Sequence, residues 1–267
     1  MEDLDFDLIK PGVILGETSH YSEYKCKYNN NYICSFKKFK TKHLPVELAK
    51  KIASCINSEL KRLKTNINLV QFIGTCFDEF NQLHLVTEFV VGMTLSCFIE
   101  KEYDSISWPQ KANIIFQLSQ GLEFLHVNNF VHRNLHSSAI LLDYDDVYCP
   151  KISDVSLHEI YDTIDEYNKV TRSREDFFWK APEITGLSFS SGSKKADIYA
   201  FGLIMWEMAL GKDVRPQVDK IAQGDLENSI KNVAEEYKAA LRSALSISPE
   251  KSPKRARINF ITSYICG

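Results

Sequence analysis

The sequence lacks the features of a secreted, membrane-spanning or nucleic-acid-binding chain. Its seven cysteines are scattered and contain no Cys-x-x-Cys pair, so we expect no disulfide framework, no zinc site and a reducing compartment. No basic segment followed by an apolar one opens the chain, and the most apolar stretch, residues 83–99, is interrupted by Glu88 and Gly92. The net charge of −3 gives no electrostatic reason to expect nucleic acid. We therefore expect a cytoplasmic protein without a membrane or nucleic-acid partner.

The first third of the chain has the pattern of strands around a single helix. Residues 13–40 alternate and are divided by turn residues, which predicts short strands. Residues 44–64 carry apolar side chains at helical spacing. Two further strands are predicted at residues 69–76 and 83–90. Together these segments predict a small β-rich lobe with one helix, about residues 1–90.

Beyond a break at Val91-Gly92 the pattern becomes mainly helical. Amphipathic or apolar-rich helices are predicted at residues 108–126 and 196–210, the second ended by Gly211, with more helical pattern in residues 217–247. Residues 157–177 are polar and predict an irregular loop, which in a compact domain is usually functional or disordered. We predict an α+β fold in one domain, 1–267, whose larger C-lobe spans about residues 91–267.

Six short motifs follow one another along the chain. They are Lys37 after a strand, Thr87-Glu88-Phe89-Val90, His132-Arg133-Asn134-Leu135, Asp154, Ala181-Pro182-Glu183, and Asp197-Ile198-Tyr199-Ala200-Phe201-Gly202. In their order and spacing they resemble the motifs of protein kinases along nearly the whole chain, which implies a bilobal protein kinase-like fold. Within kinases the chain resembles the tyrosine-kinase-like branch. It is most similar there to the pseudokinase domain of mixed-lineage kinase domain-like protein, the necroptosis effector, at residues 132–138 and 195–207.

The phosphate-covering loop departs from the glycine-rich pattern of kinases. Of the three glycines only Gly16 is present, and glycine serves there to let the backbone approach phosphates closely. Thr18 and Tyr21 place side chains in that space, and Glu23 stands where kinases have a valine against the adenine. We expect a plain β-hairpin.

The resemblance implies a vestigial nucleotide pocket formed by Lys37, Thr87 and Asp154. We expect at most weak ATP binding there and no other cofactor. The alternative for Lys37 is an exposed strand lysine. In kinases this lysine pairs with a helix glutamate, whose position here is Ile56. The partner of Lys37 is then Glu59, three residues further on, or no residue at all.

The catalytic loop has lost the side chains that the chemistry of kinases needs. Asn134 stands in the place of the aspartate base, and an amide has no basic site with which to accept a proton. Ala139 replaces a metal-binding asparagine, and His136 replaces a phosphate-contacting lysine. Asp154 is followed by Val155 and Ser156 instead of phenylalanine and glycine. We therefore expect a pseudokinase with no catalytic residue and no metal, which is not an enzyme.

The segment after Asp154 corresponds to the activation loop of kinases. By resemblance, Thr163 is a candidate phosphate acceptor in this regulatory loop and Asp165 a fixed negative charge that partly mimics the phosphorylated state. The alternative is a solvated acidic loop without a regulatory role.

Three functions remain open. The resemblance favours an interaction decoy that binds a receptor-interacting protein kinase and suppresses necroptotic signalling. We expect no N-terminal four-helix bundle of the kind that effector members carry. A free-standing domain of this type suits a viral host-interaction protein of the host cytoplasm. The alternatives are an ATP-binding sensor without turnover and a divergent, weakly active Ser/Thr kinase.

Overall fold

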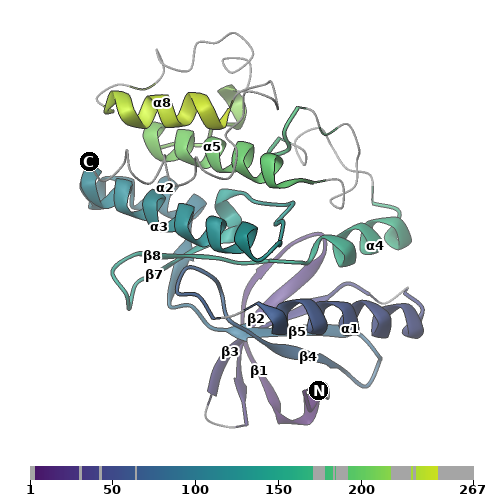
Figure 1. The fold of residues 1–267 in the computed structure, drawn as a ribbon. Coiled ribbons are helices and arrows are strands. Elements are labelled where there is room, and N and C mark those ends of the chain that lie inside the picture. The colour runs from purple at the N-terminus through teal and green to yellow at the C-terminus, as the bar shows by residue number, and fades with distance from the viewer. Residues whose placement is uncertain are drawn as a thin grey trace. The chain divides into compact units, whose positions relative to one another are not determined.

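The structure is a computed structural model that describes most of the chain as two compact units (Figure 1). The described residues are 4–29, 32–41, 44–63, 65–170, 178–182, 184, 192–217, 230 and 233–245. The N-terminal unit comprises Met1–Asn66, Val70–Val90 and Val155–Thr171. The C-terminal unit comprises Ile67–Leu69, Val91–Asp154 and Arg172–Gly267. A β-rich unit and a mainly helical one confirm the predicted α+β fold with two lobes.

The N-terminal unit is built on an antiparallel sheet with the strand order β1-β2-β3-β5-β4. Its strands are β1 (Ile9–Glu17), β2 (Tyr21–Tyr28), β3 (Tyr32–Phe39), β4 (Phe72–Phe77) and β5 (Leu83–Glu88). In the β2–β3 pair, Glu23 lies directly opposite Lys37. In the β3–β5 pair, Ser35 lies opposite Thr87. The register therefore gathers three of the kinase-motif positions on neighbouring strands.

The predicted helix of residues 44–64 is α1 (Val46–Arg62), which packs against β4 and β5. Its apolar side chains recur every three or four residues and are buried on one face, as an amphipathic helix requires. They are Ala49, Ile52, Ala53, Ile56 and Leu60. Asn57, on the same face, donates from its amide to the Thr75 hydroxyl at 2.6 Å. The helix is thereby fixed to β4 by both apolar packing and a buried hydrogen bond.

A second helix of this unit, α4 (His158–Asn168), lies in the segment expected to be irregular. That expectation is wrong for these residues, while residues 171–177 lie outside the described part of the chain. Ile160, Tyr161 and Ile164 are buried, and their spacing places them on one face of the helix. The helix ends at Lys169, whose φ of 54° gives the left-handed conformation common after a last turn.

The C-terminal unit begins with a small sheet and two helices. The sheet has the order β6-β7-β8, with β6 (Gly92–Thr94), β7 (Ile140–Asp143) and β8 (Cys149–Ile152). Helix α2 (Leu95–Lys101) follows β6, and the predicted helix of residues 108–126 is α3 (Trp108–Val127). Short 3-10 helices connect larger elements: η1 (Phe6–Leu8) lies in the N-terminal unit, and η2 (Tyr103–Ser105) and η3 (Ser137–Ala139) lie in this one. The η3 turn lies in the catalytic loop.

The core of this unit is α5 (Lys194–Leu210), which α3 and α8 (Glu235–Ala244) both contact. Every residue from Ala196 to Met208 is buried, as expected of a helix that is apolar all round. The helix ends at Gly211, as predicted: φ is +65°, and a Cβ there would lie 2.5 Å from the Tyr103 ring. A last turn, η6 (Arg215–Gln217), follows. In the part of the chain described, no helix combines the length and apolarity needed to cross a bilayer.

Candidate functional site

The β1–β2 turn, which corresponds to the phosphate-covering loop, is held by its own side chains. The Thr18 hydroxyl accepts hydrogen bonds from the backbone N–H groups of His20 at 3.2 Å and Tyr21 at 3.1 Å. A Cβ on Gly16 would meet no atom within 4 Å, so the described surroundings do not require glycine there. The strands pair normally on both sides of the turn, with Gly16 opposite Glu23. The expected β-hairpin is therefore present.

Lys37 is a buried side chain and not an exposed strand lysine, because only 5% of it is accessible. Its ammonium group donates to the Tyr21 hydroxyl at 3.3 Å and lies 4.5 Å from the centre of the Tyr21 ring. A buried ammonium group needs such partners because desolvation of an unpaired charge is costly. Tyr21, which the sequence places in the space used for phosphates, therefore shares its surroundings with the lysine.

The position expected to hold the helix glutamate is occupied by a buried apolar side chain. Ile56 is 3% exposed and packs inside the unit, so an apolar residue fills the place of the glutamate. Glu59 is half-buried near Cys55, and among the described residues no ion pair joins it to Lys37. Burial raises the pKa of the Cys55 thiol, and the nearby charges of Glu159 and Glu59 raise it further. Glu159 belongs to α4, so α1 and α4 lie close together.

Two further positions of the N-terminal unit use their polar groups locally. The Thr87 side chain is 8% exposed and donates to the carbonyl of Glu88 at 3.1 Å. The Ser35 hydroxyl donates to the Glu23 carboxylate. Glu23 is thus a hydrogen-bond acceptor within the sheet, at the position where kinases have valine.

Helix α4 is attached to the β1–β2 turn. The Asp165 carboxylate lies 2.9 Å from Nε2 of His20, and the His20 ring stacks on Tyr161 with centroids 4.5 Å apart. The Asn168 amide donates to the Lys40 carbonyl at 3.1 Å. Asp165 is only 8% exposed, so its charge faces the interior of the unit and not solvent. Thr163 is half-buried, and its hydroxyl donates to the Glu159 carbonyl one helical turn earlier.

In the C-terminal unit, Asp197 fixes the backbone of the catalytic loop. Its carboxylate, which is 1% exposed, accepts hydrogen bonds from the N–H groups of His132 and Arg133, both at 2.8 Å. Nε2 of His126 lies 2.8 Å from the same carboxylate. Arg133 has a φ of +67°, a conformation that a residue other than glycine adopts only when its surroundings impose it. The carboxylate of Asp197 therefore holds the loop in a strained backbone conformation next to Asn134.

The same loop holds the strand that leads to Asp154. Nε2 of His132 lies 2.7 Å from the carbonyl of Ser153, and both the N–H and the hydroxyl of Ser153 donate to the carbonyl of Ala139. Asp154 follows with a φ of 60° and is half-buried. The structure thus ties Asp154 closely to Ala139. Val155 and Ser156, which follow it, are both buried in the N-terminal unit.

A carboxyl group on α5 lies beside the η3 turn of the loop. Glu207 is 4% exposed, and burial raises its pKa to about 7. A hydrogen bond from the Ser137 hydroxyl acts in the opposite direction and lowers the pKa. The nearby Asp213 carboxylate raises the pKa further, and the Val214 N–H lowers it. Since such a group is largely protonated below neutral pH, its contact with Ser137 depends on its ionisation state.

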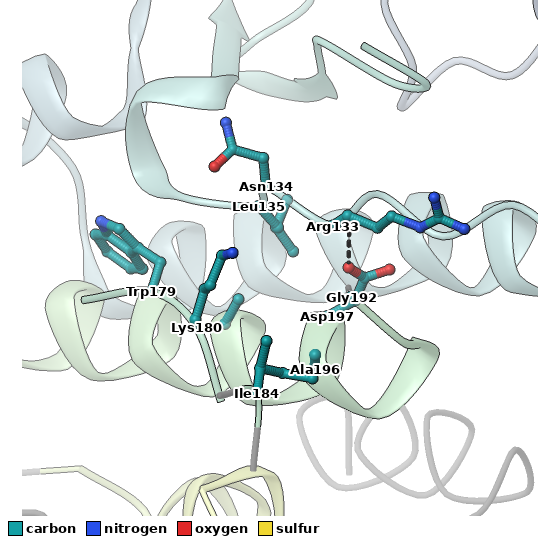
Figure 2. A pocket seen from close by; sticks show the side chains of 10 residues that line it. Arg133, Asn134, Leu135, Trp179, Lys180, Ile184, Gly192, Ala196 and Asp197 are labelled. Carbon is teal, nitrogen blue, oxygen red and sulfur yellow. Dashed lines mark hydrogen bonds between the residues drawn. The ribbon is translucent and has the colours of Figure 1, made fainter. Parts of the chain in front are cut away.

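Beside the catalytic loop the C-terminal unit contains a pocket of about 370 Å³, including the solvent at its mouth (Figure 2). Arg133, Asn134 and Leu135 of the loop line one part of it, and α5 lines another. Trp179 and Lys180 complete the wall. We did not predict a role for Lys180 from the sequence, although its place directly before Ala181-Pro182 was a usable signal. Glu183, the last residue of that motif, lies outside the described residues.

The side chains present define what chemistry the loop can supply. Asn134 is half-buried and offers an amide, and Ala139 offers no side-chain ligand to a metal. The His136 ring lies 6.3 Å from the Trp179 ring, between centroids. Of the two protein positions that hold magnesium in kinases, only Asp154 carries a carboxylate, so the residues fit a magnesium–nucleotide only in part. No step that depends on a second protein ligand follows from this site.

Comparison with known proteins gives a match over most of the chain. Residues 14–258 match the family model described as protein tyrosine and serine/threonine kinase. The chain is 26% identical to the serine/threonine-protein kinase STY46 of Arabidopsis thaliana over 79% of its length. It is 34% identical to the G-type lectin S-receptor-like serine/threonine-protein kinase At1g61480 of the same plant, over 55%, and 30% identical to the human cytoplasmic tyrosine-protein kinase BMX, over 58%. It spans 35%, 18% and 23% of the lengths of these proteins.

These comparisons contradict the expectation that the chain is not an enzyme. The relatives are named as serine/threonine and tyrosine kinases, and the family model extends across both units. The expectation gave the substitutions at Asn134 and Ala139 decisive weight. Catalytic groups that act as a unit are not additive, and removing some of them commonly leaves residual activity from those that remain.

Proposed function

The chain belongs to the protein tyrosine and serine/threonine kinase family, and from that premise we propose that it is a divergent, weakly active serine/threonine kinase domain. The observation that carries the proposal is the intact scaffold of the catalytic loop. Asp197 binds the backbone of His132 and Arg133, and His132 contacts the residue before Asp154. A scaffold of this kind positions a nucleotide and an acceptor, and positioning is most of what phosphoryl transfer needs from a protein.

Two side chains take the charge-bearing roles in this proposal. Lys37 supplies a buried positive charge for nucleotide phosphates, with Tyr21 as its partner in the absence of nucleotide. Asp154 would hold magnesium, which would supply positive charge to neutralise the phosphates. Binding of ATP is weak in this proposal, because Tyr21 and Lys37 must separate and only one protein carboxylate receives the metal.

The expected rate follows from the missing base. General-base catalysis contributes typically about 10²- to 10⁴-fold. Kinases commonly turn over at about 1–100 s⁻¹, so a domain without the base is expected at rates on the order of 10⁻⁴ to 1 s⁻¹. That range lies within reach of a radiolabelled assay but is easily confused with contamination.

The test is a phosphotransfer assay of the wild type against Lys37→Met and Asp154→Ala. We expect each variant to lose the activity by at least about tenfold, since each removes a charged contact worth about 1.5–3 kcal/mol. Thermal-shift titration with ATP, with and without magnesium, gives an independent measure of binding. Activity that persists in both variants is contamination and contradicts the proposal. A magnesium-dependent shift without transfer identifies a nucleotide sensor instead.

We propose as a second function that the domain associates with a receptor-interacting protein kinase in the cytoplasm and thereby suppresses necroptotic signalling. The support is the resemblance of residues 132–138 and 195–207 to mixed-lineage kinase domain-like protein. The same resemblance is our reason for proposing that the source is a virus. Attachment of α4 to the β1–β2 turn favours this function, since it gives the regulatory segment a fixed surface. Co-precipitation is expected to recover the partner kinase, and a lack of association would contradict it.

A further inference from the structure

Glu207 is a buried carboxyl group that no step of the proposed transfer uses. It lies on α5, where every residue from Ala196 to Met208 is buried, and it is itself 4% exposed. The Ser137 hydroxyl and the Val214 N–H donate to its carboxylate. Its second oxygen, Oε2, has no hydrogen-bond partner among the described residues. A charge on this group is therefore costly, because a buried carboxylate needs acceptor contacts at both oxygens.

The charges closest to Glu207 do not offset that cost. The Asp213 carboxylate repels a second negative charge and so favours the neutral form of Glu207. Arg215 is the cation that acts on Glu207, but its guanidinium group pairs with Asp213 at 2.7 Å. The pair as a whole therefore supplies little positive charge to Glu207.

The other titratable side chains buried on the helices against α5 have partners of their own. They are Lys111 and His126 of α3 and Tyr237 of α8. The Lys111 ammonium lies 3.3 Å from the centre of the Tyr103 ring, and His126 contacts Asp197 at 2.8 Å. The Tyr237 hydroxyl donates to a backbone carbonyl of α5 at 2.7 Å. A charge on Glu207 is therefore left largely uncompensated by these helices.

A short chain of contacts connects Glu207 to the strand that leads to Asp154. Ser137, which donates to Glu207, is the first residue of the η3 turn, and Ala139 is the last. The Ala139 carbonyl accepts the N–H of Ser153 at 2.9 Å and its hydroxyl at 3.0 Å. Asp154 follows Ser153 directly. The η3 turn thus lies between the buried carboxyl group and the proposed metal ligand.

We propose that Glu207 is a positioning residue whose protonation state sets how firmly the η3 turn is held, and through that turn the backbone that carries Asp154. In its acid form Glu207 is a neutral group that suits its apolar surroundings. In its ionised form it carries a charge that favours opening of the turn to water. The proposal rests on the proposed kinase function for the role of Asp154, whereas the holding of the turn does not depend on it.

The sign of the pH dependence follows from the burial of Glu207. Its pKa is raised from the usual 4.5 to about 7, so between these values the folded chain holds a proton that the unfolded chain has lost. The stability that this proton contributes is present below the lower value and is lost as the pH rises through the higher one. The catalytic loop is therefore expected to be held most firmly on the acid side of neutral pH.

The first test is urea unfolding of the wild type and Glu207→Gln, whose amide has nearly the same size and cannot ionise. The folding equilibrium constant of the wild type, relative to that of Glu207→Gln, is expected to fall about 30-fold between about pH 5.5 and about pH 8. Other titrating groups cancel in this ratio. The matched control is Glu236→Gln, which removes an exposed carboxylate of the same unit and is expected to leave the ratio to wild type constant.

The second test follows the turn itself by hydrogen exchange of the Ser153 N–H, which bonds the Ala139 carbonyl. Its exchange rate in the wild type, divided by that in Glu207→Gln, is expected to rise from about pH 5.5 to about pH 8, since opening becomes easier when Glu207 ionises. A constant ratio would overturn the link from Glu207 to Asp154. Neither measurement uses nucleotide, so an inactive domain would leave this result standing.

Infrared spectroscopy of the wild type tests the proposal without a variant. A carboxylic acid band is expected to persist above about pH 5.5, where an ordinary glutamate is ionised, and to disappear as the pH rises past neutral. Loss of every carboxylic acid band below about pH 5.5 would overturn the proposal, as would the same pH dependence of unfolding in the wild type and Glu207→Gln.

Discussion

Replacement of Asn134 with aspartate is expected to raise the rate of phosphoryl transfer about 10²- to 10⁴-fold. The two side chains have nearly the same size, and the backbone N–H of residue 134 already bonds Nδ1 of His132 at 3.3 Å, so the loop is not expected to move. What changes is the basic site: a carboxylate accepts the proton of the acceptor hydroxyl, and an amide does not. Initial rates at saturating magnesium–ATP measure the effect.

The control for this substitution is Asn134→Leu, which keeps the side-chain size and adds no basic site. Its rate is expected to stay within a few-fold of the wild type, since the wild-type amide contributes no proton transfer. A rate that does not rise in Asn134→Asp would mean that the missing base does not limit transfer. The loss at Ala139 would then be the stronger candidate.

Replacement of Asp197 with alanine is expected to lower the free energy of unfolding by about 3–5 kcal/mol. The carboxylate is 1% exposed and bonds the N–H groups of His132 and Arg133. Removing it leaves these buried donors without an acceptor and His126 without its partner. The left-handed backbone at Arg133 also loses the contact that holds it. Urea unfolding of wild type and variant at one pH gives the difference.

Asp213→Ala serves as the matched control on the same unit. Asp213 is partly exposed and pairs with Arg215 two residues away, at 2.7 Å. Exposed local pairs of this kind contribute about 1 kcal/mol or less. Asp213→Ala is therefore expected to unfold within about 1 kcal/mol of the wild type. If Asp197→Ala behaved in the same way, the catalytic loop would not depend on this carboxylate for its conformation.

Much of the fold follows from patterns that the sequence shows directly. The spacing of apolar residues predicts α1, α3 and α5 to within a few residues, and Gly211 predicts where α5 ends. Local signals suffice there because burial and spacing agree. Helix α4 was missed although Ile160 and Ile164 are one turn apart, because the acidic residues between and after them dominate the composition of the segment.

The contacts of the candidate site depend on tertiary placement, so fewer of them could be predicted from the sequence. The motif order identified Lys37, Asn134 and Asp154, but no sequence pattern indicates that Tyr21 lies over Lys37. The contact of His20 with Asp165 joins residues 145 positions apart. Contacts between residues so far apart in the sequence can be identified only once the fold is known.

The most direct test of the central claim is a single-turnover measurement on the wild type with excess protein over radiolabelled ATP and a serine-containing acceptor peptide. The account predicts phosphopeptide formation with a rate on the order of 10⁻⁴ to 1 s⁻¹ that disappears in the Lys37→Met/Asp154→Ala double variant. A wild-type signal equal to that of the double variant, from protein that still unfolds cooperatively, would contradict the account of this domain as a weakly active kinase.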